Sequence, residues 1–128
     1  MTDWSTVAYP AWWVRRAEER RAILDVAVAR LREAIATDPD LVAALVFASY
    51  ATGILLKKND LDVMVLTTLP AAGDPGLRHA TIARRLALDV SCDLLVHEPA
   101  EFERLVTERA FVARARREGI WIDAASPR

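Results

Sequence analysis

The sequence predicts an α/β (α+β) fold in which a small mixed β-sheet carries helices packed on one face. Short apolar runs of strand length alternate along the chain with longer segments of helical periodicity. The 128 residues are 53% hydrophobic, which is enough for one buried core without disulfides. Because no internal repeat or linker divides the sequence, we expect residues 1–128 to form a single domain.

The first predicted element is a long amphipathic helix over about residues 11–37. Apolar side chains recur at three- and four-residue steps from Trp13 to Ile35, while charged side chains mostly fill the other face. The helix should end near Thr37, because the residue before Pro39 is disfavoured in helical geometry. The tryptophans crowded in this N-terminal segment have two interpretations, as core residues that cover the sheet or as the interface of a homo-oligomer.

Three apolar segments predict the strands of the sheet. The run Leu41–Phe47 is short and continuously apolar, which favours a strand buried on both faces. The second strand is Asp60–Leu66 and the third is Val90–Val96. Between them, residues 68–76 are rich in proline and glycine and predict a loop, and helical spacing from Leu77 to Leu86 predicts a helix.

The last third of the chain predicts further helices and a short strand. Pro99, followed by the acidic Glu101, is typical of the first turn of a helix, and a basic helical stretch continues through Arg117. Gly119 suits a helix C-terminus, and residues 120–122 have the composition of a short strand.

Charge and cysteine content exclude several classes of function. The formal net charge is −1, with 17 basic and 18 acidic residues, so a nucleic-acid partner is not indicated. The single cysteine, Cys92, excludes an intrachain disulfide and a cysteine-based zinc site, and its apolar neighbours favour a core role. No apolar run approaches the roughly 18 residues of a membrane span. We therefore expect a cytoplasmic protein without a membrane partner.

Three aspartates form the candidate site. Asp60 and Asp62 stand two residues apart on a predicted strand, so their side chains leave the same face. Two carboxylates at about 4 Å repel by about 4 kcal/mol at an effective dielectric of about 20, a cost that a divalent cation turns into attraction. Asp93 lies within the third apolar run and completes a three-carboxylate cluster if that strand pairs beside the second. Oxygen ligands of this kind suit Mg²⁺ or Mn²⁺ with the phosphates of a nucleotide.

Small residues follow the first predicted strand. Around Ser49 and Gly53, backbone N–H groups and the serine hydroxyl are placed to bind phosphate at a helix start. The segment from Ala48 to Gly53, followed after six intervening residues by Asp60-Leu61-Asp62, resembles the Gly-Ser-x-Ala-Arg-Gly and Ser-Asp-x-Asp motif of the nucleotidyltransferase superfamily (polymerase beta-like). The resemblance covers about residues 41–117 and implies a nucleotidyltransferase fold.

Within that superfamily the chain looks like the minimal nucleotidyltransferases (MNT type), which are often antitoxins of HEPN-domain toxins. The resemblance implies a Mg²⁺-dependent transfer of a nucleoside monophosphate, with ATP or another NTP as substrate, to a hydroxyl acceptor on a HEPN-type partner. It assigns metal binding and catalysis to Asp60, Asp62 and Asp93, and binding of the β and γ phosphates to Ser49 and Gly53.

The departures from the motif lie on the phosphate side. Ala48 replaces the usual glycine, Thr52 the arginine, Ile54 a common acidic residue and Asn59 the serine. The neighbouring pair Lys57-Lys58 offers replacement charge. An alternative hypothesis is therefore a catalytically degenerate binding module that acts as an antitoxin-like or assembly partner.

Overall fold

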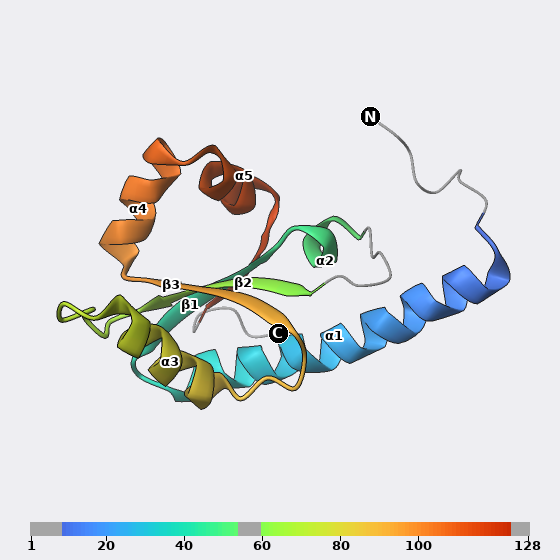
Figure 1. Ribbon diagram of the computed structural model, residues 1–128, viewed down its shortest axis with the longest axis horizontal. Helices are drawn as coiled ribbons and strands as arrows, with labels where there is room; N and C mark the ends of the chain where they lie inside the picture. Colours follow the sequence, from blue (N-terminus) through green and yellow to red (C-terminus); the bar gives the residue numbers. More distant parts are fainter. Residues whose placement is uncertain (1–8, 54–59, 124–128) are drawn as a thin grey trace.

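The computed structural model describes residues 9–53 and 60–123 (Figure 1). The helices are α1 (Ala11–Thr37), α2 (Ser49–Thr52), α3 (Pro75–Leu86), α4 (Pro99–Glu108) and α5 (Ala110–Glu118). The strands are β1 (Leu41–Phe47), β2 (Leu61–Thr67), β3 (Cys92–His97) and β4 (Ile120–Asp123). No helix in these two ranges is both long and apolar enough to cross a membrane.

The strands form one mixed sheet in the order β3-β2-β1-β4. β1 is antiparallel to both β2 and β4, whereas β2 and β3 are parallel. The crossover from β2 to β3 contains α3, as a parallel connection requires. The predicted α/β fold with a small mixed sheet is confirmed. The bounds of the first strand agree with the prediction, and β3 begins two residues later than expected.

Helices cover both faces of the sheet, whereas the sequence predicts them on one face only. On one face, alternate strand residues such as Val46 and Val63 pack with Leu24 and Leu31 of α1 and with Ile82 of α3. The other face has a second core cluster, in which strand residues pack against α4 and α5 (Figure 1); its buried members are Ala43, Leu45, Met64, Leu66, Phe102, Val112 and Ala115. This second layer includes the face of β2 from which Asp62 projects, because residues 62, 64 and 66 share one side of a strand.

The long N-terminal helix forms over the predicted residues but only part of it packs on the sheet. Its buried residues run from Leu24 to Ile35. The N-terminal half continues past the edge of the sheet (Figure 1). At the other end, Arg85 of α3 donates to Asp40 at 2.7 Å and holds the turn between α1 and β1.

Gly119 ends α5 for a reason other than the left-handed geometry common at helix ends. Its φ is −79°, which any residue adopts. A Cβ at this position would lie 2.5 Å from the carbonyl oxygen of Ala115 and 2.5 Å from Cδ1 of Leu45. The close approach of α5 to β1 therefore requires glycine here.

Candidate functional site

Two of the predicted aspartates are direct neighbours in the sheet. In the parallel pair of β2 and β3, Asp62 is the register partner of Asp93. Residues directly opposite each other on paired strands point to the same face, so the two carboxyl side chains lie side by side. Asp62 is half-buried and Asp93 is exposed, so the pair lies at a surface that is open on the side of β3.

Burial and neighbouring negative charge determine the electrostatics of Asp62. Burial raises the pKa of Asp62 above its usual value, and the charges of Asp93 and Asp60 raise it further. Burial, followed by the charges of the same three aspartates, raises the pKa of the Cys92 thiol to about 11. Cys92 therefore stays protonated at neutral pH, as expected of a core residue rather than a nucleophile.

Asp60 immediately precedes Leu61, the first residue of β2. It is half-buried, and the backbone beside it is fixed because the N–H of Leu61 donates to the carbonyl of Ser91 at 3.0 Å. Among residues 9–53 and 60–123, no group of three or more His, Cys, Asp or Glu side chains is arranged to hold a metal ion. The structure thus brings Asp62 and Asp93 together and leaves Asp60 within electrostatic range, and the metal role of all three stays a prediction.

The small-residue turn is next to the aspartates. Phe47, the last residue of β1, is the register partner of Asp62, and α2 begins two residues later at Ser49. Gly53 ends this short helix in the left-handed region, with φ 81°, and its N–H donates to the carbonyl of Ser49 at 3.1 Å. The glycine is therefore required by the turn itself, and the phosphate-binding role of Ser49 and Gly53 stays a prediction.

Ala48 has a backbone conformation that normally belongs to glycine. Its φ is 57° and its ψ is −136°, a region that L-residues with a Cβ rarely adopt. The sequence has alanine where the motif that it resembles has glycine, and the backbone here has a conformation that suits glycine. The Ala48 side chain is exposed, so the strain is in the backbone rather than in core packing.

We expect Ala48→Gly to stabilise the protein by about 1 kcal/mol, because relief of about 1–3 kcal/mol of strain exceeds the added entropy of the unfolded chain. Urea unfolding measures the difference. Ala51→Gly, within the same short helix, is the matched control and should destabilise by about 1 kcal/mol. Equal losses of stability in both variants would contradict the assigned strain.

A cluster between α1 and α2 holds the turn in place and was not found by sequence reasoning. The Tyr50 hydroxyl donates to Asp25, and Nη1 of Arg21 donates to the carbonyl of Tyr50 at 2.9 Å. The Arg21 guanidinium also lies 4.1 Å from the centre of the Tyr50 ring. Burial and the Asp25 contacts raise the pKa of Tyr50 to about 12. The only sequence signal was Arg21 and Asp25 at a four-residue spacing, which by itself indicates a surface ion pair.

Thr52, at the position of the motif arginine, lies in α2 with an exposed side chain. Four other positions from the motif comparison, Ile54, Lys57, Lys58 and Asn59, lie outside the described residues.

Comparison with known proteins supports the fold. Neither family models nor curated proteins give a match to the sequence. A solved structure does match: a protein from Sulfolobus solfataricus, provisionally described as a nucleotidyltransferase, with a TM-score of 0.50 and 16% sequence identity. The match covers 77% of this chain and 84% of that protein. At this identity the likeness concerns the fold, and the chain therefore has a nucleotidyltransferase-like fold.

Proposed function

We propose that the chain is a nucleotidyltransferase that transfers a nucleoside monophosphate, most simply AMP from ATP, to a hydroxyl group. The observation that carries the proposal is the register pairing of Asp62 with Asp93 beside the turn at Ser49. The charge of Asp93 raises the affinity of Asp62 for a proton, and by the same electrostatics two adjacent carboxylates attract a cation.

The donor set fits a cation that arrives with a nucleotide. Mg²⁺ is usually held by one or two carboxylates together with waters and substrate phosphates, rather than by an all-protein cage. Asp62 and Asp93 supply two carboxylates, and Asp60 is close enough to contribute charge. Mg²⁺ or Mn²⁺ bound there would stabilise charge on the reacting phosphate. We therefore expect weak binding of the cation alone and tighter binding of the cation with ATP.

The chemistry assigns a separate role to each residue. The acceptor hydroxyl oxygen forms a bond to the α-phosphorus, the bond from that phosphorus to the β-phosphate oxygen breaks, and pyrophosphate leaves. The three aspartates hold the cation, and Asp93, as the exposed member of the pair, also takes the proton of the acceptor hydroxyl. The Ser49 hydroxyl donates to the β or γ phosphate, because the Gly53 N–H is already used within the turn.

The acceptor in this proposal is a protein hydroxyl, on a HEPN-type partner as the resemblance implies, in the cytoplasm. A second candidate function, a partner-binding module without catalysis, is favoured by the Ala48 methyl at the phosphate side of the turn. The two functions differ in whether ATP is bound and consumed, so nucleotide binding is the first property to test.

Thermal unfolding with and without ATP and Mg²⁺ tests the proposal. At a ligand concentration 100 times its dissociation constant, we expect about 2.7 kcal/mol of stabilisation and a rise in Tm of about 5 °C or more. The rise should disappear in Asp62→Asn and persist in Asp89→Asn, which removes a charge from an exposed position outside the pair. A wild type that ATP and Mg²⁺ do not stabilise would favour the binding module, which should still capture its partner.

A further inference from the structure

One stripe of α1 is exposed along its whole length. Its residues are separated by alternating steps of four and three, the spacing that keeps side chains on one side of a helix. All eight are exposed, while the sheet-facing side of the same helix is buried; the stripe consists of Trp12, Arg16, Glu19, Ile23, Val26, Arg30, Glu33 and Thr37.

Large apolar side chains occupy the centre and one end of this stripe. Ile23 is 50% exposed, Val26 is 71% exposed and Trp12 is 53% exposed. Ile23, Val26 and Arg30 also border a hollow of about 220 Å³, whose lining includes Asp89 and Val90. The stripe therefore has an exposed apolar centre next to this hollow, and side chains of another molecule can contact both.

The charges on the stripe complement a second copy of the same helix in antiparallel orientation. With Ile23 of one copy opposite Val26 of the other, Glu19 lies opposite Arg30 and Arg16 lies opposite Glu33. Twofold symmetry repeats each of these pairs, so four Arg–Glu pairs flank an apolar centre. Within the described residues, none of the four charged side chains is in an ion pair of its own chain.

Other registers lose this match. A parallel pair places Glu19 opposite Glu19 and Arg30 opposite Arg30, and like charges at an interface are strongly unfavourable. An antiparallel shift by one heptad places Val26 opposite Arg30 or opposite Arg16, which removes the apolar centre. One register therefore satisfies both the apolar and the charged positions.

We infer that the chain forms a symmetric homodimer through antiparallel pairing of α1 along this stripe. The arrangement also explains why α1 extends beyond the sheet (Figure 1). In the pair, the N-terminal half of each α1 lies along the C-terminal half of the other, and the two sheets lie at opposite ends. Ile23 and Val26 of the second copy lie at the hollow beside residues 89 and 90.

Sedimentation equilibrium over micromolar to submillimolar concentrations tests the inference. We expect the wild type to associate to twice its mass of 14.2 kDa. Glu19→Arg and Arg30→Glu should each raise the dimer dissociation constant about tenfold or more, because each places like charges opposite one another twice. Glu18→Arg, an equal charge change at an exposed position beside the stripe, is the control and should dimerise as the wild type does.

Mixing the two charge-reversed proteins gives the sharpest outcome. Glu19→Arg and Arg30→Glu chains complement each other at both positions, so an equimolar mixture should form a heterodimer with affinity near that of the wild type. Circular dichroism of each variant verifies its folding. A wild type that stays monomeric, a Glu19→Arg chain that dimerises normally, or a mixture that does not associate would each overturn the inference.

Discussion

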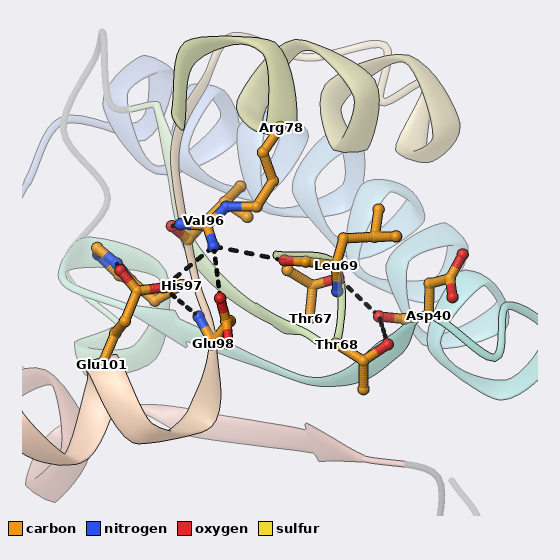
Figure 2. A network of polar contacts seen from close by, with 9 residues as sticks. All are labelled: Asp40, Thr67, Thr68, Leu69, Arg78, Val96, His97, Glu98 and Glu101. Carbon is orange, nitrogen blue, oxygen red and sulfur yellow. Dashed lines mark hydrogen bonds and ion pairs between the residues drawn. The ribbon is translucent and has the colours of Figure 1, made fainter. Parts of the chain in front are cut away.

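Arg78→Met is expected to destabilise the protein by about 3 kcal/mol, since it leaves buried or half-buried acceptors without their donor. The Arg78 side chain is only 4% exposed although it is charged. It donates to Glu101 at 3.1 Å, to the carbonyl of Val96 at 3.2 Å and to the carbonyl of Leu69 at 3.4 Å (Figure 2). One side chain of α3 thereby joins the end of β3, the start of α4 and the loop after β2.

The carboxylate of Glu101, which accepts from Arg78, explains why Arg78→Met should lose so much stability. Burial alone would raise the pKa of Glu101, yet the N–H of Glu98 and the Arg78 guanidinium together lower it. Removing Arg78 leaves this carboxylate with its helix-capping hydrogen bond from Glu98, at 2.8 Å, and without its cation. The pKa of Glu101 should rise in the variant.

Urea unfolding at neutral pH measures the effect of Arg78→Met, with Arg84→Met as control. Arg84 is exposed on the same helix, and its substitution should change stability by less than about 0.5 kcal/mol. Arg78→Lys keeps the charge but not the planar fork of donors and should fall between the two. Equal unfolding midpoints for Arg78→Met and Arg84→Met would show that the network contributes no net stability.

Features that depend on local pattern were predictable from the sequence. The long helix and the strand Leu41–Phe47 have their predicted bounds, because amphipathic period and an uninterrupted apolar run are properties of adjacent residues. The pairing of Asp62 with Asp93 was predictable only conditionally, since it required β3 to lie beside β2. The parallel register supplies that condition.

Features that depend on contacts between distant segments were not predictable. Arg78 looked like one of several basic residues on an amphipathic helix, and its burial depends on contacts with the loop after β2, the end of β3 and the start of α4. Tyr50 filled a variable position of the motif, and its contact with Asp25 joins residues that are 25 positions apart. The glycine-like backbone at Ala48 contradicts the preference of alanine, so residue type pointed away from it.

Asp62→Asn is expected to have opposite effects on stability with and without ligand. In the absence of metal at neutral pH, the ionised Asp62 lies beside Asp93 and near Asp60, and we expect its neutralisation to stabilise the fold by about 1 kcal/mol after allowance for solvent screening. With ATP and Mg²⁺, the same substitution should remove the ligand-dependent stabilisation. A side chain that destabilises the free protein and is required for the bound one is typical of a binding site rather than of a structural contact.

The pH dependence separates this electrostatic effect from a change in packing. Because the folded-state pKa of Asp62 lies above its usual value of 3.8, the folded protein holds the proton more tightly than the unfolded chain does. Below 3.8 the carboxyl is protonated in both states and the wild type is not penalised. As pH rises from there through the folded pKa, the wild type loses stability relative to Asp62→Asn, and above it the difference is constant. Thermal melts of both proteins in EDTA across this range should show a difference in Tm that increases with rising pH. A difference in Tm that is independent of pH would assign the effect to packing or hydrogen bonding instead of charge.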